Sequence, residues 1–138
     1  MNVSSLVTRV GAVAEASPFL LTETDDPFSF DQQPQTAIDG AYRIEADLVR
    51  QEGYLGMACL EVWHVTLWTA KRAGRSPATV RETLTTTISS LTAALHRDAL
   101  ASCEHEIVEV DGDVQYPDGE AEYLVGRVSA QMEFDRSL

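Results

Sequence analysis

MACLEVWHVTLWTA, residues 57–70, is the stretch that decides the fold of this chain of 138 residues. It is rich in β-branched and aromatic residues, which favour strands, and its side chains alternate between two faces. Strands that are apolar on both faces are typical of the interior of a sheet. We therefore predict a central strand here, or one that is covered on both sides. The apolar residues are Met57, Cys59, Trp63, Val65 and Leu67 on one face and Leu60, Val62 and Trp68 on the other.

The segment before this strand supplies its partner. In TAIDGAYRIEADLVRQ, residues 36–51, apolar and polar side chains alternate over the second half. A period of two predicts a half-buried strand. Gly53 and Gly56 then bracket a turn, so the two segments are expected to form an antiparallel hairpin. The side chains predicted to share its apolar face are Tyr42, Ile44, Ala46 and Leu48.

The segment after the central strand is the best helix in the chain. Ser76 is a good N-cap, and Pro77 suits the first helical position, where a missing N–H costs nothing. His96 and Arg97 are expected in the last turn, beside the negative end of the helix dipole. Several threonines weaken the helix propensity, so packing must hold the helix in place. The predicted core-facing stripe is Val80, Leu84, Ile88, Leu91 and Leu95.

The two ends of the chain add one helix and a second hairpin. Apolar residues at helical spacing over 3–14 predict an amphipathic helix, followed by a long loop with a short extended piece at Phe19–Thr22. Strands are predicted around 104–110 and 121–134. Their connection contains two turn sequences, Asp111-Gly112 and Pro117-Asp118-Gly119, which are placed at the hairpin tip.

Taken in order, these elements predict a single α+β domain over residues 1–138. The expected architecture is an antiparallel four-stranded sheet, made of two hairpins, packed with an N-terminal helix and a central amphipathic helix. Long loops are expected between these elements.

The composition excludes several classes of function. The chain has 22 acidic and 10 basic residues, a formal net charge of −12, which argues against charge-driven binding of nucleic acid. No apolar run reaches the ~18 residues of a membrane span, and residues 1–16 are interpreted as a mature helix rather than a signal peptide. The two cysteines, Cys59 and Cys103, are expected to be free buried thiols.

No motif in the sequence predicts catalysis or metal binding. CEHE, residues 103–106, lacks the second ligand pair of a zinc site, so a solvated strand edge is expected there. DGDVQYPDGE, residues 111–120, has Tyr116 where a calcium loop needs glycine. His64 lies in an apolar strand and is interpreted as a satisfied core or interface histidine. We expect neither an enzyme nor a cofactor.

The loop DDPFSFDQQPQT, residues 25–36, is unusual because it places two phenylalanines in an acidic segment. Phe28 and Phe30 could fold back to fill the core of the domain. They could instead anchor a neighbouring subunit, since aromatic residues in polar loops are typical of binding sites. The sequence leaves both alternatives open.

Four segments together resemble the tail terminator (tail-completion) proteins of long-tailed bacteriophages and related particles. They are DPFSFDQQPQTAIDGAYRIE (26–45), LEVWHVTLWTAKR (60–72), ATVRETLTTTISSLTAALHRD (78–98) and EYLVGRVSAQMEFDRSL (122–138). The resemblance rests on the pattern and order of elements, covers roughly residues 20–138, and is most specific in the final alternating strand.

The resemblance implies a structural role in the neck of the virion. Such proteins form a homo-oligomeric ring, usually of six subunits, that caps the tail tube, ends tail growth and joins a connector or stopper protein of the head. They assemble in the host cytoplasm without a membrane, and DNA only passes through the lumen. Phe28, Phe30, Lys71, Arg72 and Arg75 are the candidate subunit-interface residues. Carboxylates facing the lumen would repel DNA; the candidates are Asp111, Asp113, Asp118, Glu120 and Glu122.

Other functions remain possible alternatives. One is a head-completion or stopper protein, or a tail-tube subunit, of the same kind of particle. Another is a soluble cytoplasmic adaptor or binding module whose aromatic loop holds a peptide or a small ligand.

Overall fold

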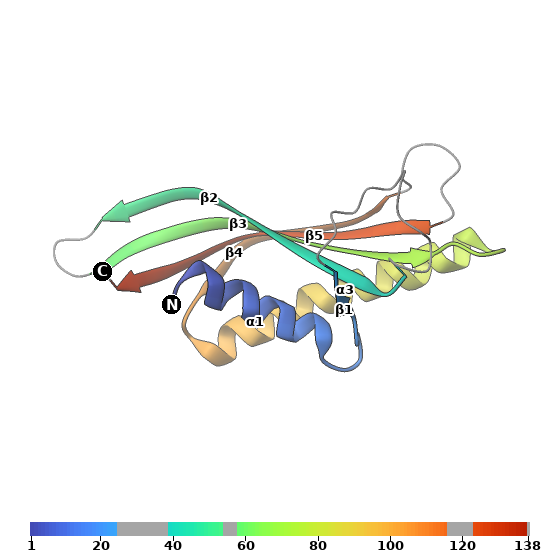
Figure 1. The fold of residues 1–138 in the computed structure, drawn as a ribbon, viewed down its shortest axis with the longest axis horizontal. Coiled ribbons are helices and arrows are strands. Elements are labelled where there is room, and N and C mark those ends of the chain that lie inside the picture. The colour runs from blue at the N-terminus through green and yellow to red at the C-terminus, as the bar shows by residue number, and fades with distance from the viewer. Residues whose placement is uncertain (25–38, 54–57, 116–122, 138) are drawn as a thin grey trace.

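The computed structural model describes residues 1–24, 39–53, 58–115 and 123–137. Figure 1 shows a long, twisted sheet with two helices packed beneath it. The elements in chain order are α1 (Val3–Glu15), β1 (Thr22–Glu23), β2 (Ala41–Gly53), β3 (Ala58–Arg72), α3 (Pro77–Ser102), β4 (Glu106–Gln115) and β5 (Tyr123–Ser137).

The sheet has five strands in the order β1-β2-β3-β5-β4. The predicted α+β class and the central position of β3 are confirmed, and β2 pairs with β3, and β4 with β5, as antiparallel hairpins. The predicted number of four strands is wrong, because the two-residue strand β1 runs parallel to β2 at the edge. Such a strand is too short to show an alternating pattern. It is held by backbone bonds, such as that from the Thr22 N–H to the Gly40 carbonyl at 3.0 Å.

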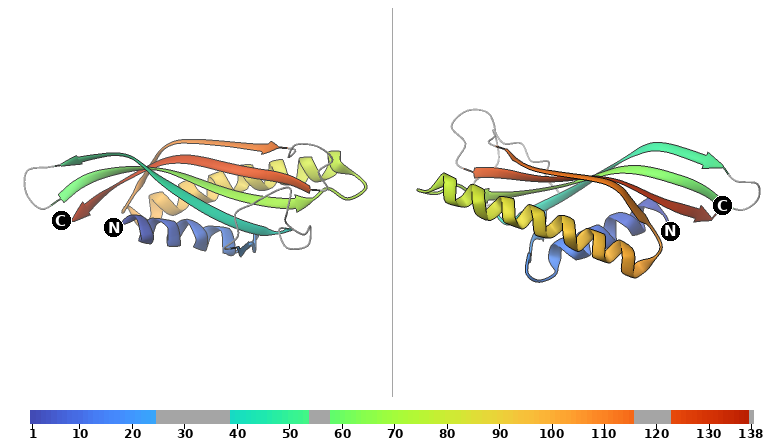
Figure 2. Two further views of the ribbon diagram at one scale, coloured as in Figure 1. Left: turned by 45° about the horizontal axis from the view of Figure 1, so that its top comes forward. Right: turned by 180° about the vertical axis from the view of Figure 1, so that it is seen from behind.

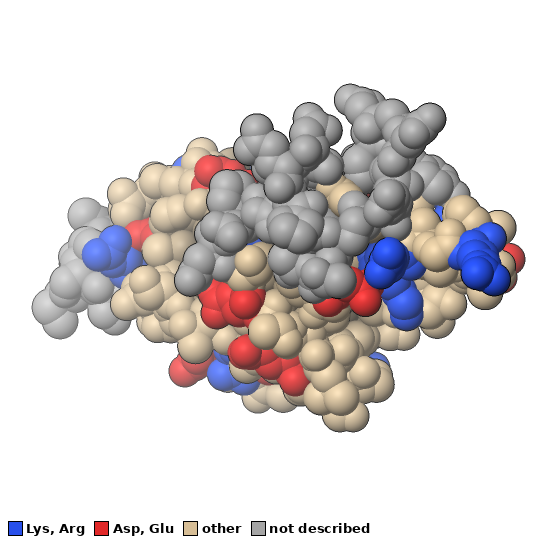
Figure 3. Space-filling model, turned by 45° about the vertical axis from the view of Figure 1, so that its right-hand side comes forward, with Lys and Arg blue, Asp and Glu red and all other residues tan. Residues whose placement is uncertain are grey.

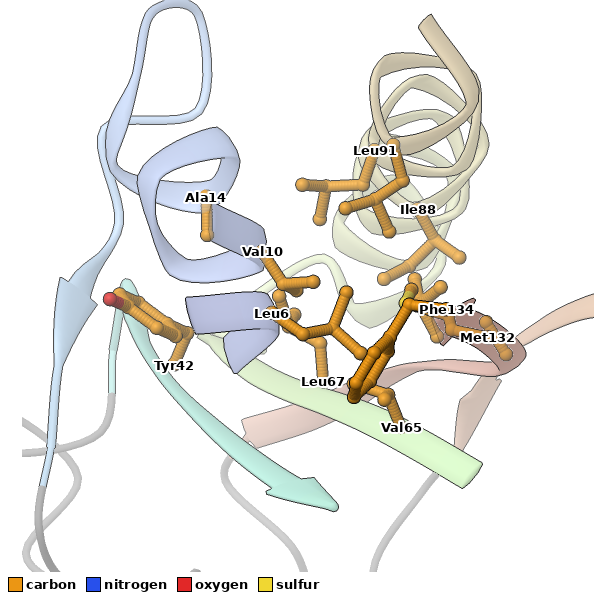
Figure 4. Close-up of a cluster of buried hydrophobic side chains, with 13 residues drawn as sticks. Leu6, Val10, Ala14, Tyr42, Val65, Leu67, Ile88, Leu91, Met132 and Phe134 are labelled. Atoms are coloured by element: carbon orange, nitrogen blue, oxygen red, sulfur yellow. The ribbon is translucent and has the colours of Figure 1, made fainter. Parts of the chain in front are cut away.

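Both helices cover the same face of the sheet (Figure 2). Apolar side chains of α1 and α3 meet those of β2, β3 and β5 in one core between the two layers (Figure 4). The alternation of the last strand is visible in its burial, since residues 124 to 134 are buried at every second position. The core residues are Leu6, Val10, Ala14, Tyr42, Val65, Leu67, Ile88, Leu91, Leu95, Val128, Ala130, Met132 and Phe134.

Two strand glycines let α3 approach the sheet closely. A Cβ added to Gly112 in β4 would lie 2.7 Å from Cγ2 of Ile88, and one added to Gly126 in β5 would lie 2.7 Å from its Cδ1. Glycine in a strand often marks such a close approach. The prediction of a turn at Asp111-Gly112 is therefore wrong: both residues lie inside β4, and Gly112 makes room for the helix.

Strands β2 and β4, the outermost of the four long strands, each contain a β-bulge. In β2, Leu48 pairs with Trp63 and Arg50 with Val62, which leaves Val49 as an extra residue. In β4, Val108 is left out in the same way, between Ile107 and Glu109. Val49 and Val108 are both exposed. The Val49 bulge explains why the predicted alternation of β2 becomes irregular at this residue. Leu48, predicted to share the apolar face, keeps the register of that face but is exposed.

The helix ends differ in part from the predictions. α1 ends at Glu15 as expected, whereas α3 continues to Ser102, so His96 and Arg97 do not lie in its last turn. The pattern was misleading because Ala99, beyond the last predicted stripe residue, is also buried. Ser76 occupies the N-cap position, but its side chain makes no capping hydrogen bond.

Of the two free cysteines, only Cys59 is buried as predicted. Cys103 is exposed, and it forms the C-cap of α3 in the left-handed conformation (φ 57°).

Candidate functional site

The candidate site is the face of the sheet opposite the helices, which we call the open face. The strand pairing places alternate side chains of the four long strands there. Most of them are polar, and carboxylates outnumber arginines. The charged residues are Arg43, Glu45, Asp47, Arg50, Glu52, Arg72, Glu106, Glu109, Asp111, Asp113, Arg127, Glu133 and Asp135.

Arg43, Arg50 and Arg127 each lie in an ion pair with a carboxylate of the open face. Arg43 pairs with Glu45 at 2.7 Å and Arg50 with Glu52 at 3.2 Å. Arg127 donates to Asp113 through Nε at 3.1 Å and through Nη2 at 3.3 Å. These three positive charges are thus neutralised locally, and the remaining carboxylates give the open face a negative potential.

A hydrogen-bonded group of three side chains lies in the middle of this face. Ser129 Oγ is 2.9 Å from His64 Nε2 and 3.3 Å from Thr66 Oγ1. Thr66 and Ser129 are cross-strand partners, and His64 is diagonal to Ser129. His64 and Ser129 border a shallow hollow of about 300 Å³ with Glu109, Asp111, Arg127 and Gln131. His64 is exposed, so of the two alternatives predicted for it, the core histidine is wrong and the interface histidine stays a prediction.

This group can relay a proton between the imidazole and the serine hydroxyl. Nucleophilic catalysis would also need a group that orients the imidazole. Among the described residues no carboxylate is hydrogen-bonded to Nδ1 of His64. The described part of the chain also contains no cluster of three or more His, Cys, Asp or Glu side chains that could hold a metal ion. We interpret the group as a cross-strand hydrogen-bond ladder.

Of the predicted acidic residues, Asp111 and Asp113 do not lie at a hairpin tip. Asp111 and Asp113 lie on the open face within β4, and both contact Arg127. The tip assignment failed for these two because β4 extends five residues beyond its predicted end at 110, as far as Gln115. Asp118, Glu120 and Glu122 lie outside the described residues, as do Phe28 and Phe30.

The predicted basic interface residues do form a group. Lys71, Arg72 and Arg75 are exposed at the point where β3 turns into α3. Figure 3, with this end of the molecule brought forward, shows Lys and Arg side chains gathered there. Asp39 holds the backbone of the turn, since its Oδ1 accepts from the Arg72 N–H at 2.7 Å.

One functional-site candidate was missed by the sequence analysis. Glu61 is only 2% exposed and accepts hydrogen bonds from Trp63 Nε1 at 2.9 Å, Gln51 Nε2 at 2.9 Å and Arg136 Nη1 at 3.1 Å. Burial alone would raise the pKa of its carboxyl, but these hydrogen bonds and the charge of Arg136 lower it overall. The available signal was a lone acid on the apolar face of the central strand.

Comparison of the chain with protein-family models and with curated proteins yields no match. Within the described residues, no helix is long and apolar enough to span a bilayer. The functional argument therefore rests on the geometry and charge of the chain itself.

Proposed function

We propose that this chain is a structural protein of a tailed bacteriophage or related particle. In this proposal, it forms a ring that caps the tail tube, ends tail growth and provides the surface to which the head is joined. The resemblance in sequence pattern suggested this role. The observation that carries it is the open face, where carboxylates outnumber arginines and Arg43, Arg50 and Arg127 are paired with carboxylates.

A negative face suits the lining of a channel that DNA must cross. Proteins hold DNA mainly through lysine and arginine contacts to phosphates, and an acidic wall offers none. The opposite face of the sheet is occupied by the two helices and the core. This division leaves one face for the lumen and the ends of the molecule for contacts between subunits. The ring is usually of six subunits in the family that the sequence resembles.

The test uses purified tail tubes that have been assembled without a terminator. Added protein is expected to appear in negative-stain images as a cap on one tube end, and further addition of tube subunits should stop. Free tube ends that keep growing would contradict the proposal. Long tubes made of this chain alone would identify a tube subunit instead. Binding to the portal end of filled heads, but not to tubes, would identify a stopper protein.

A further inference from the structure

The end of α3 distant from the basic residues borders a groove. It is a hollow of about 630 Å³ between the last turns of α3, the start of β4, and strands β3 and β5. Its floor is apolar, with Leu60, Ile107 and Leu100, which is 78% exposed. β4 pairs with β5 only as far as Glu133, so residues 134–137 of β5 have no described strand beside them on this side. We call this hollow the α3-end groove.

The rim of the groove is acidic. Glu106 and Glu133 are direct cross-strand partners, an arrangement that is destabilising for like charges. Glu104 and Asp135 border the same hollow. None of these four carboxylates forms an ion pair with any described residue. The rim thus leaves negative charge uncompensated around an apolar floor.

A buried imidazole also lines the groove. His105 is 5% exposed, and Ser102 Oγ lies 3.4 Å from its Nδ1. Nε2 of His105 has no hydrogen-bond partner among the described residues. Burial, the largest influence, lowers the pKa of His105, which keeps the ring neutral at pH 7. A neutral ring that donates through Nδ1 has an Nε2 acceptor available for an incoming N–H donor.

The opposite end of α3 carries the complementary charge. We call residues 71–75, with Lys71, Arg72 and Arg75, the basic turn. None of these three side chains forms an ion pair with another described residue. The backbone of the basic turn is fixed by Gly74 in the left-handed conformation (φ 62°) and by the hydrogen bond from the Arg72 N–H to Asp39.

Both charge groups also oppose the dipole of α3. Cations are favourable at the C-terminus of a helix and anions at its N-terminus. α3 has no acid in its first turn and no base in its last, while bases precede it and acids follow it. Contact between the N-terminal end of one α3 and the C-terminal end of another would bring opposite charges together and align the two dipoles.

We propose that the basic turn of one copy docks into the α3-end groove of a second copy. The long aliphatic parts of Lys and Arg cover Leu100 and Leu60, while their charged ends reach the acidic rim and His105. This contact joins two different patches, so its repetition produces a ring if the rotation closes and a filament if it does not. The inference rests on the proposed ring function, because it names the subunit contact of that ring.

Native Cys103 lines the groove and makes a direct test possible. Ser76→Cys places a thiol beside the basic turn and keeps all three bases. After mild oxidation, this variant is expected to give a ladder of dimers, trimers and larger species on non-reducing gels. Ser89→Cys, with its thiol on the exposed middle of α3, is the matched control and should give no more than the dimers of the unchanged chain. Equal products from the two variants would overturn the contact.

Charge reversal provides the second test. Lys71→Glu/Arg72→Glu/Arg75→Glu and Glu104→Lys/Glu106→Lys/Glu133→Lys are each expected to lose the ladder when introduced with Ser76→Cys, and to keep the wild-type circular dichroism spectrum. Mixing the two triple variants restores both kinds of opposite-charge contact and should restore the ladder. A mixture that stays monomeric would overturn the proposal. If the ladder is restored but tail tubes remain uncapped, the contact stands and the proposed function fails.

Discussion

Glu61 is a charged residue on the buried, largely apolar face of β3. Its carboxylate is buried on the helix side of the sheet, and three donors from β2, β3 and β5 surround it. The bulge at Val49 makes this possible, because it shifts the alternation of β2 and places Gln51 directly opposite Glu61. The network therefore ties the last residues of β5 to the β2–β3 hairpin.

We predict that Glu61→Gln lowers the free energy of unfolding by about 1–3 kcal/mol at pH 7, since an amide cannot accept from all three donors. The folded-state pKa of Glu61 lies below the ordinary 4.5, so the stabilisation is full above that value and is lost as the pH falls through the folded pKa. Urea unfolding between pH 7 and pH 3 should show the difference shrinking below about pH 4.5. Glu45→Gln, at an exposed ion pair, is the control and should change little. A difference that is constant with pH would contradict the ionic role.

Glycine is required at position 126 because Ile88 occupies the space that a side chain at this position would take. Gly126→Ala is expected to lower the free energy of unfolding by about 1–3 kcal/mol, the usual cost of overpacking. Gly53→Ala is a matched control, because no described atom lies within 4 Å of the added Cβ. Thermal unfolding of both variants measures the effect. The loss should be partly recovered in Gly126→Ala/Ile88→Val, and a lack of coupling between the two sites would refute the explanation.

At the scale of elements, α3 is a helix held by its packing. The hydroxyls of Thr83, Thr85 and Thr86 are exposed and donate to the carbonyl four residues earlier, at 3.0, 2.7 and 3.0 Å. Such bonds do not compensate for the poor helix propensity of threonine. The buried stripe on the opposite side of α3 therefore supplies most of the stability of this helix.

Replacing these three threonines by alanine should stabilise the protein. Each change is expected to add up to about 0.6 kcal/mol to the free energy of unfolding, the difference in helix propensity. The midpoint of urea unfolding should rise for the triple variant. Thr66→Ala is a contrasting control, because Thr66 is buried and bonded to Ser129, so its midpoint should fall. A triple variant that unfolds at lower urea would show that the exposed face of α3 contributes contacts of its own.

The sequence predicted an element correctly wherever its own apolar residues recurred with the period of a helix or a strand. The two apolar faces of β3 placed it at the centre, and the stripe from Leu84 to Leu95 correctly identified the core side of α3. The failures came from features that depend on distant partners. A bulge such as Val49 adds one residue to a strand, and it can be recognised only from the pairing with the opposite strand. Asp111-Gly112 has the composition of a turn, but the glycine is needed because Ile88 occupies the space beside it.

The candidate site was less predictable than the fold for the same reason. The basic group at residues 71–75 was visible because it is contiguous in sequence. The cross-strand pair of Glu106 and Glu133, the contact between His64 and Ser129, and the hydrogen bonds of Glu61 each join residues from different strands. Their pairing follows from the register of the sheet, which the sequence pattern does not specify.

At the scale of the whole molecule, the negative charge of the protein determines which partners it can bind. With a net charge of −12 and an open face on which Arg43, Arg50 and Arg127 are ion-paired, the wild-type chain should not retain duplex DNA in a gel-shift assay at about 0.15 M salt. Asp47→Lys/Glu109→Lys/Gln131→Lys adds cations to the same face and should produce measurable, salt-sensitive retention. Retention by the wild-type chain would contradict the assignment of this face to a DNA passage.

The bulges at Val49 and Val108 also protect the molecule from aggregation. The unpaired side of an edge strand is a template on which other chains can add, and natural proteins interrupt such edges with bulges and charges. Deleting Val49 would keep every cross-strand pair of β2 and give it a regular edge. We expect this deletion variant to form thioflavin-binding fibrils at concentrations where the wild-type chain stays dispersed. The same bulges would keep newly made chains separate until they reach the correct partner.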